Sequence, residues 1–284
     1  MGFSHSTPSN LEVLPNFTHG PEKLNRQLAD VVDLEKNPLE NKDFRAECKR
    51  TLEKDGALVM RNFLKPELIS SIRSEGLKQQ HLAYYTDTDH NIFLSDTDPN
   101  YSKNHPRNRL VSSSKGCITH NQILCDSALR IIYNAKEFRD FLCTVLNELA
   151  LYEYADAQSS INLHYASEGE ELGWHYDNSS FAITLMIDSA KAGGEFEFVK
   201  DVRNADAGEM NYEMSEQILD GAIDAEKLAI CPGDLILFRG RNSMHRVTPT
   251  LGDRTRILVV LAYNSEPGIS LSESARMTFF GRID

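Results

Sequence analysis

The stretch "GWHYDNSSFAITLMIDS", Gly173 to Ser189, joins a candidate metal-binding motif to a strand-forming run. It contains a His, one spacer and an Asp, at His175 and Asp177, and this is the only His-x-acid pattern in the chain. From Phe181 onward the stretch is apolar and β-branched, and polar residues end it, which is typical of a short strand. The two polar side chains are therefore expected at a strand edge, where ligands from several strands can converge.

The same strand character continues on both sides of this stretch, through most of the second half of the chain. Short β-branched or aromatic runs, bounded by Gly, Pro, Asp or Asn, are "SSINLHYA" (159–166), "GEFEFVKDV" (194–202), "KLAICPGDLILFRG" (227–240), "HRVTPT" (245–250) and "TRILVVLAYN" (255–264). Strands at this density, without long helices between them, predict a sandwich, jelly roll or barrel. One acidic segment, 203–226, interrupts them and is expected to be an insertion over one end of the sheet.

The N-terminal half has a different pattern. Residues 41–56 predict a helix that ends at Gly56, and 65–80 predict a second helix with Pro66 at its start. The clearest amphipathic pattern, 127–149, predicts one helix that begins at Asp126 or Ser127. We therefore expect residues 1–40 to be an N-terminal arm and 41–284 a single domain, with helical or mixed support over 41–150 and the β core over 151–284.

Composition excludes several classes of function. The net charge is −12 and the chain has no run of Lys or Arg, which argues against a nucleic-acid or membrane-surface partner. No apolar stretch approaches the ~20 residues that a membrane span needs. The first residues lack the basic and apolar regions of a signal peptide, and the five Cys are odd in number and never spaced C-x-x-C. We expect a cytoplasmic protein with reduced thiols and a small-molecule substrate; the sequence does not indicate an oligomeric state.

A third metal ligand is available at His245, which opens "HRVTP". Two His and one carboxylate bind one face of a metal and leave the other face open, which suits Fe(II) that must also bind a cosubstrate and O2. A closed zinc site would want a fourth protein ligand, and none is evident. The distal carboxylate of 2-oxoglutarate then needs a cation, which Arg256 or Arg254 can supply. Of the two we favour Arg256, because it adjoins the apolar strand and should reach the inside.

The order of these motifs is more specific than any one of them. An H-x-D, then "AGGEFEFV", "PGDL", "HRVTP", an Arg and a terminal "FFGR" follow one another over 161–282. In this order the segment resembles the Fe(II)/2-oxoglutarate-dependent oxygenases, and among them the BesD-like free-amino-acid halogenases and their hydroxylase relatives. The resemblance implies an α+β, mainly β fold: a double-stranded β-helix (jelly roll, cupin-like) core with N-terminal supporting helices. It also implies Fe(II) on His175, Asp177 and His245, with 2-oxoglutarate and O2 as cosubstrates.

One position separates the chemistries within this group. The halogenases carry Gly or Ala in place of the carboxylate, and chloride takes the vacant site, whereas here Asp177 is present. The resemblance therefore implies a dioxygenase that hydroxylates an unactivated C–H bond of a small polar substrate, such as a free amino acid or a derivative, or that desaturates it. The alternatives are an oxygenase that modifies proteins or peptides, and a non-catalytic jelly roll that binds a metal or ligand.

Other polar residues are candidates for the rest of the site. Strand alternation places Asn162 and His164 on one face, where either can line the cosubstrate pocket, while Tyr165 points the other way into the core. The candidates for binding the polar groups of the substrate are Arg107, Arg109, Asn178 and Ser180. The polar segment 86–122 and the insertion 203–226 are expected to cover the mouth of the site.

Overall fold

The computed structural model describes residues 26–283. Its α-helices are α1 (Leu28–Val31), α2 (Lys42–Asp55), α3 (Pro66–Gln79), α4 (Ala128–Asn134), α5 (Lys136–Leu146), α6 (Tyr212–Leu219) and α7 (Glu273–Phe280). Short 3-10 helices are η1 (Gln80–Leu82) and η2 (His120–Gln122). The strands are β1 (Ala57–Met60), β2 (Tyr84–Asn91), β3 (Leu110–Ile118), β4 (Ile161–Ala166), β5 (Leu172–His175), β6 (Ala182–Asp188), β7 (Ala192–Gly193), β8 (Phe196–Val199), β9 (Glu226–Leu228), β10 (Leu235–Phe238), β11 (Met244–Val247), β12 (Thr250–Leu251) and β13 (Arg256–Leu261).

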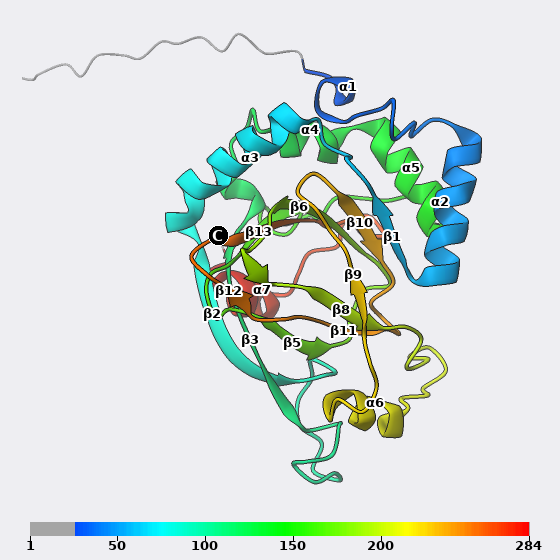
Figure 1. Ribbon diagram of the computed structural model, residues 1–284, viewed down its shortest axis with the longest axis vertical. Helices are drawn as coiled ribbons and strands as arrows, with labels where there is room; N and C mark the ends of the chain where they lie inside the picture. Colours follow the sequence, from blue (N-terminus) through cyan, green and yellow to red (C-terminus); the bar gives the residue numbers. More distant parts are fainter. Residues whose placement is uncertain (1–25, 284) are drawn as a thin grey trace, which may run out of the picture.

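The strands form one curled antiparallel sheet whose two ends face each other (Figure 1). The strand order is β1-β10-β6-β13-β4-β3-β5-β11-β8-β9, with β2 paired to β3 outside this path and β12 paired to β7 in a small ribbon. One half, from β1 to β4, packs against helices, and the other half, from β5 to β9, lies across from it. The curl creates an interior between the two halves, and the candidate site lies there.

Residue alternation along β4 and β13 separates a core face from an interior face. Leu163 and Tyr165 belong to the main hydrophobic core, together with Ile257 and Val259 of the paired strand. Tyr165 is fully buried and its hydroxyl donates to the Gly76 carbonyl at 2.7 Å, as expected from its place in the strand. The alternate residues point into the curl, because successive side chains of a strand point to opposite faces.

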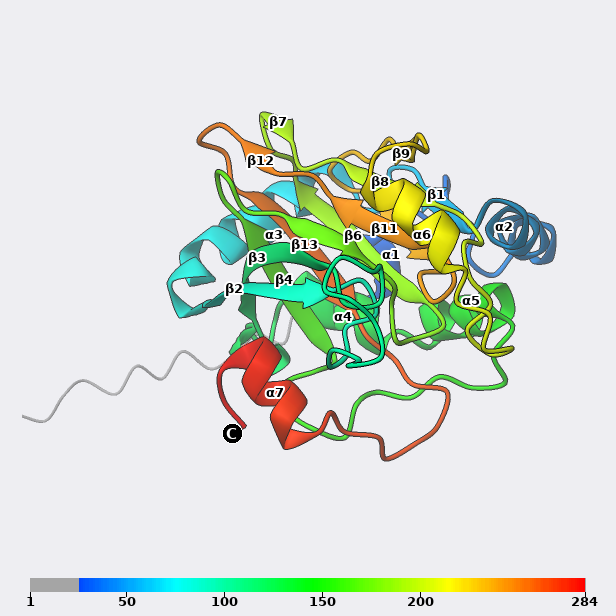
Figure 2. The same cartoon turned by 90° about the horizontal axis from the view of Figure 1, so that it is seen from below.

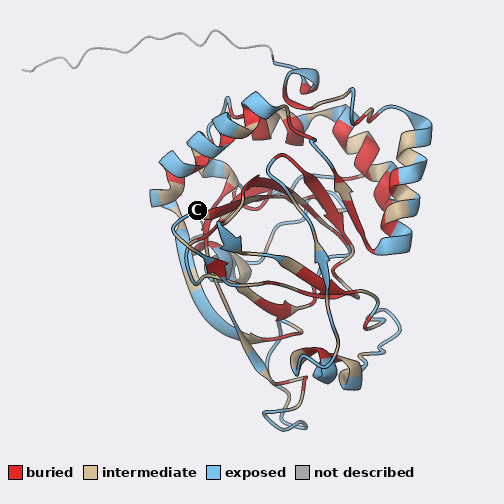
Figure 3. Cartoon of the chain, in the orientation of Figure 1, coloured by how far each residue is buried: buried red, intermediate tan, exposed pale blue. Residues whose placement is uncertain are grey.

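The helices α2 to α5 cover the outer face of the first half of the sheet, and burial is concentrated on the faces that they share (Figures 1 and 3). Helix α2 ends at Gly56 with φ of 72°, and α3 has Pro66 at its first position, as the sequence predicts. Gly56 tolerates this left-handed conformation because it has no Cβ. The predicted support layer of helices is thus in place beneath the strands of the candidate site.

The single helix predicted over 127–149 is wrong, because the chain forms two. Ser127 caps the first, α4, by accepting a hydrogen bond from the Leu129 amide at 3.3 Å. Ala135 is extended, with φ of −66° and ψ of 124°, and separates α4 from α5. No Gly or Pro marks this break; both helices bury apolar faces in the same core, so tertiary packing overrides the continuous helical pattern.

The part of the predicted arm that the structure describes packs onto the domain. Leu28, Val31 and Leu39 lie in the same hydrophobic core as the helices. The rest of the arm, residues 1–25, lies outside the described residues. Among residues 26–283 no helix is long and apolar enough to cross a membrane.

The long polar segment and the insertion meet at one end of the molecule (Figures 1 and 2). Tyr212 of α6 contacts the rings of Tyr101 and His105 from the loop that joins β2 to β3, at centroid distances of 5.5 and 4.8 Å. Phe93 of this loop stacks at 5.5 Å on Tyr176, the residue between the two ligand candidates His175 and Asp177. The insertion and the loop therefore form one aromatic assembly that ends beside the H-x-D motif.

Candidate metal and cosubstrate site

Two strands and one turn bring the three predicted ligands together. His175 ends β5 and is the direct antiparallel partner of His245 in β11, while Asp177 lies two residues beyond His175. The Oδ1 atom of Asp177 is 3.9 Å from Nε2 of His175 and 3.5 Å from Nε2 of His245. One ligand atom from each residue lies within 4.8 Å of the others. The structure therefore gathers two imidazoles and one carboxylate at one point of the curl, although 68 residues separate Asp177 from His245 in the sequence.

Backbone hydrogen bonds orient both imidazoles toward this point. Nδ1 of His175 donates to the Gly173 carbonyl at 2.7 Å, and Nδ1 of His245 donates to the Ser243 carbonyl at 3.0 Å. With the proton on Nδ1, each Nε2 presents a lone pair, which is the arrangement that metal-binding histidines use. The two bonds fix the ring orientation before any ligand arrives.

Asp177 is held with one oxygen unpaired. Its amide donates to the Gly240 carbonyl at 3.1 Å, and its Oδ2 atom is buried without a hydrogen-bond partner among the described residues. A Cβ at position 240 would lie only 1.9 Å from Oδ2, so the carboxylate needs a glycine there. A buried carboxylate oxygen without a partner is costly, and a metal ion would satisfy it.

The electrostatics of the cluster favour a neutral imidazole beside an ionised carboxylate. Burial and the neighbouring His245 lower the pKa of His175 to about 3. Burial alone would raise the pKa of Asp177, but the two histidines and Lys115 outweigh it and lower this pKa from its usual value. Neutral imidazole and ionised carboxylate are the forms that bind a metal.

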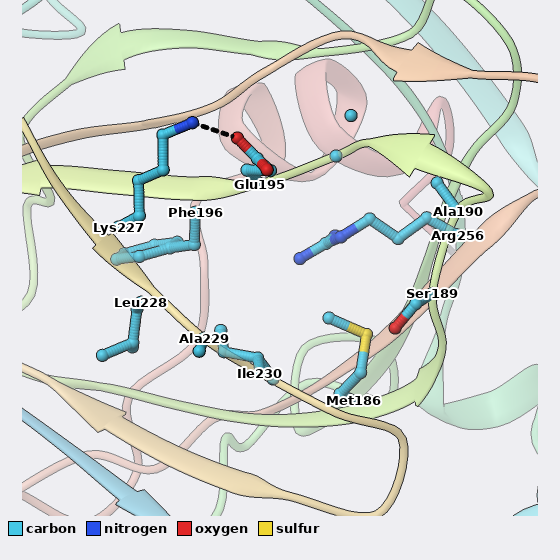
Figure 4. Close-up of a pocket in the computed structure, with 12 residues that line it drawn as sticks. Met186, Ser189, Ala190, Glu195, Phe196, Lys227, Leu228, Ala229, Ile230 and Arg256 are labelled. Carbon is cyan, nitrogen blue, oxygen red and sulfur yellow. Dashed lines mark hydrogen bonds and ion pairs between the residues drawn. The ribbon is translucent and has the colours of Figure 1, made fainter.

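Arg256 reaches the same interior from β13. The cavity that contains the three ligand candidates measures about 280 Å³, and Arg256 lines it as well as a neighbouring pocket between β8, β9 and β6. Figure 4 shows the guanidinium extended into that neighbouring pocket, between Phe196, Met186 and Ile230. Arg256 is 5% exposed, its Nε atom has no hydrogen-bond partner, and burial lowers its pKa to about 10. This is a buried cation directed at open space.

The other two cosubstrate candidates lie elsewhere. Arg254 is exposed at the start of the strand and lines neither pocket. Asn162 is buried, but its amide nitrogen donates to the carbonyls of Gln158 and Ile161, and the residue does not line the cavity. Its neighbour on the same strand face, His164, does line it.

The four substrate candidates are not brought to the cavity. Arg107 donates to the Asp96 carbonyl at 2.9 Å and lies over the Phe93 ring, and Arg109 is paired with Asp220 of the segment after α6. Asn178 and Ser180 are exposed at the turn beyond Asp177. None of the four lines the cavity, although the intervening Ser179 does.

Sequence reasoning missed several residues that line the cavity. They are Lys115 from β3, Tyr154 from the segment before β4, and Phe181 and Tyr263 beside β6 and β13. Strand alternation could have located a residue of β3, but only if the pairing of β3 with β4 had been known. Nothing in the local pattern around Tyr154 distinguishes it from an ordinary loop residue.

One protein family matches most of the chain. The model of the family described as "HalD: Halogenase D" matches residues 40–278. No curated protein sequence matches the chain.

Solved structures share the fold. A 2-oxoglutarate–Fe(II) oxygenase family protein from Burkholderia pseudomallei superimposes with a TM-score of 0.50 at 12% identity, over 81% of this chain and 95% of that one. The non-heme alpha-ketoglutarate-dependent epimerase SnoN of nogalamycin biosynthesis gives a TM-score of 0.55 at 9% identity, over 78% and 81% of the two chains. The same epimerase in complex with Fe3+, alpha-ketoglutarate and nogalamycin RO gives 0.51 at 9% identity, over 78% and 84%.

These likenesses establish the fold, and the predicted jelly-roll core with supporting helices is confirmed. The prediction of an oxygenase of the Fe(II)/2-oxoglutarate-dependent superfamily is also confirmed, because the family match and the fold agree. Through the match over residues 40–278, the chain belongs to the Halogenase D family.

Proposed function

We propose that the protein hydroxylates a C–H bond of a small polar molecule, a free amino acid or a close derivative, with Fe(II), 2-oxoglutarate and O2. The observation that carries this proposal is the complete set of two imidazoles and one carboxylate, with Asp177 in place beside His175 and His245. The cavity of about 280 Å³ beside this set suits a small substrate.

Fe(II) fits the three residues. Their donor set is two nitrogens and one oxygen, which is the set used by non-heme Fe(II) oxygenases. Both imidazoles are fixed with Nε2 available, and Asp177 has a buried oxygen that lacks a partner. When bound, Fe(II) with its cosubstrates supplies the oxidising chemistry, while the protein positions the reactants and excludes bulk water.

Arg256 is assigned to the distal carboxylate of 2-oxoglutarate. It is a buried cation without a carboxylate within 4.0 Å among residues 26–283, and it lines the cavity that holds the metal ligands. A guanidinium gives a carboxylate two parallel hydrogen bonds, which fixes the orientation of the cosubstrate as well as its affinity. The exposure of Arg254 favours Arg256 over it.

Asp177 is assigned the role of favouring hydroxylation over halogenation. Resemblance to the BesD-like group associates halogenation with Gly or Ala at this position, where a halide replaces the carboxylate. In this chain the carboxylate occupies that position and contributes a negative charge, and both properties disfavour a halide. Hydroxylation follows from this reading although the family is named for halogenation.

The test is mass spectrometry of products from the twenty free amino acids, with Fe(II), 2-oxoglutarate and air, at high and low chloride. The expected result is a product 16 mass units heavier, formed with succinate, and unaffected by chloride. Asp177→Gly should lose nearly all of this product. Chlorinated product from the wild type, or wild-type hydroxylation by Asp177→Gly, would contradict the assignment; a loss of two mass units would show desaturation, and product only on added peptides would show a protein-modifying enzyme.

The free state of the cysteines is the basis for proposing a cellular compartment. All five are free thiols, and Cys125 and Cys231 are exposed. Exposed thiols persist in reducing compartments, so we place the enzyme in the cytoplasm. A fluorescent fusion of the full chain, followed by cell fractionation, checks this.

A further inference from the structure

The interior contains a second cation besides Arg256. Lys115 on β3 lines the cavity, and its ammonium lies 3.4 Å from Nδ1 of His164 on β4. Within residues 26–283 no carboxylate lies within 4.0 Å of this ammonium. Lys115 is half-buried, and this burial lowers its pKa.

Lys115 and Arg256 line the same cavity from β3 and β13, the two strands that flank β4. His164 of β4 lines the cavity between these strands, and its Nδ1 lies 3.4 Å from the Lys115 ammonium. The three metal-ligand candidates line this cavity too. The cavity thus contains two cations from separate strands together with the candidate metal site.

A count of charges shows that the cosubstrate does not need Lys115. Under the proposed function, the 2-oxo acid end of 2-oxoglutarate binds the metal and its distal carboxylate pairs with Arg256. Both carboxylates of the cosubstrate are then satisfied. The predicted substrate cations, Arg107 and Arg109, are engaged with Asp96 and Asp220 outside the cavity. Lys115 remains the one cavity cation, among the described residues, without an assigned anion.

We propose that Lys115 is the residue that positions the substrate, by pairing with a carboxylate of the substrate in the cavity that contains the metal ligands. The substrate is therefore a small carboxylic acid. This inference rests on the proposed function and adds the group by which the substrate is recognised.

The side chains that line the rest of the cavity indicate the chemistry of the rest of the substrate. Apart from the metal ligands, the two cations and the polar residues His164, Ser179 and Thr184, the cavity is lined by apolar and aromatic side chains, among them Phe181, Ile183, Leu261 and Tyr263. Among residues 26–283, Asp177 is the only carboxylate that lines the cavity. A cationic side chain of the substrate would therefore find no free anionic partner, because Asp177 is assigned to the metal. The substrate is an acid with an apolar body, and its amino group, if present, meets the hydroxyls of Ser179 or Tyr154.

The experiment compares free L-amino acids with their carboxamides, using wild-type enzyme, Lys115→Met, Lys115→Arg and the exposed control Lys42→Met. Succinate and product are measured with Fe(II), and 2-oxoglutarate affinity is measured by calorimetry on the Mn(II)-loaded protein without turnover. The wild type should accept acids with apolar side chains and reject the carboxamides. Lys115→Met should raise the KM for the acid by about 30-fold or more, as expected when one partner of a buried charge pair is removed. Lys115→Arg should recover part of this loss, and Lys42→Met should behave as wild type.

Calorimetry separates this inference from the proposed function. Unchanged affinity of Lys115→Met for 2-oxoglutarate is expected, and it shows that the variant is folded. A variant with weakened 2-oxoglutarate binding and an unchanged KM for the acid would make Lys115 a cosubstrate residue and overturn the inference. Equal turnover of acids and carboxamides by the wild type would also overturn it, while leaving the hydroxylase in place. No succinate and no product from any of these compounds would instead contradict the proposed function.

Discussion

At the scale of single residues, the mark of the candidate site is a pair of buried polar atoms that have no hydrogen-bond partner among the described residues. Asp177 Oδ2 and Arg256 Nε are both buried and unpaired among the described residues, and both face the interior. Buried polar groups are almost always hydrogen-bonded in folded proteins, so two such groups in one cavity indicate that ligands complete them.

Arg256→Ala should weaken 2-oxoglutarate binding strongly while leaving metal binding intact. Removing one partner of a buried ion pair costs about 3–5 kcal/mol, because the other charge is left buried and uncompensated. Calorimetric titration of the Mn(II)-loaded protein with 2-oxoglutarate measures this change. Arg254→Ala is the matched control, since Arg254 is an exposed arginine two residues away. Weakened binding in the control together with normal binding in Arg256→Ala would reverse the assignment.

At the scale of elements, strands were predictable and their partners were not. The runs of 161–166, 182–188 and 256–261 form strands as expected, because they are rich in β-branched residues and turn-forming residues bound them. The H-x-D and the later His, predicted as ligands from residue type and motif order, lie with their ligand atoms within 4.8 Å of one another. Lys115 was missed because its role depends on the β3–β4 pairing, which joins residues almost 50 positions apart. The break at Ala135 was missed because only tertiary packing produces it.

Asp156 lies before β4 and forms hydrogen bonds both with its neighbours in the sequence and with a segment near the C-terminus. Its Oδ1 atom accepts from the amides of Gln158 and Ser159 at 3.0 and 2.9 Å and from the Ser159 hydroxyl at 2.8 Å, and its Oδ2 atom accepts from the Leu271 amide at 3.0 Å. Burial alone would raise the pKa of Asp156, but these hydrogen bonds outweigh it and lower the pKa from 3.8.

Asp156→Ala should therefore lower the free energy of unfolding by about 1–3 kcal/mol at pH 7, since the carboxylate is charged but partly exposed. A carboxyl group with a lowered pKa stabilises the fold above its unfolded pKa and loses this effect as the pH falls through its folded pKa. The difference between wild type and variant should then shrink below pH 3.8. Urea titrations at several pH values measure it, and the exposed Asp87→Ala serves as control. A difference that persists unchanged at acidic pH would show that the charge is not responsible.

At the scale of the whole molecule, the candidate site takes its residues from both halves of the curled sheet. His175 and His245 come from the half of the sheet that lies away from the helices, whereas Arg256 comes from the half that the helices support. A metal with its cosubstrate would connect the two halves, so binding should stabilise the fold as a unit.

Mn(II) should raise the free energy of unfolding by about 2.7 kcal/mol at a concentration of 100 times its Kd, because a ligand that binds only the folded state adds RT ln(1 + [L]/Kd). Thermal unfolding with and without the metal measures the shift. Further addition of 2-oxoglutarate should raise Tm again. Asp177→Ala should lose most of the metal effect, and Lys42→Met should retain it. An equal shift for Asp177→Ala and wild type would mean that the metal binds elsewhere.

The pairing of His175 with His245 also bears on how readily the chemistry can diversify. The two imidazoles are cross-strand neighbours whose spacing is set by sheet registry, whereas Asp177 stands in the turn beyond β5. Under the proposed function, Asp177 is thus a third metal ligand that lies outside the paired strands, whereas the two histidines are held by the sheet. Exchange of one turn residue changes the number of protein ligands without displacing the other two. Under the proposed function, we therefore expect the reaction to diverge among related sequences at this turn, while the strand pairing that spaces the two histidines is kept.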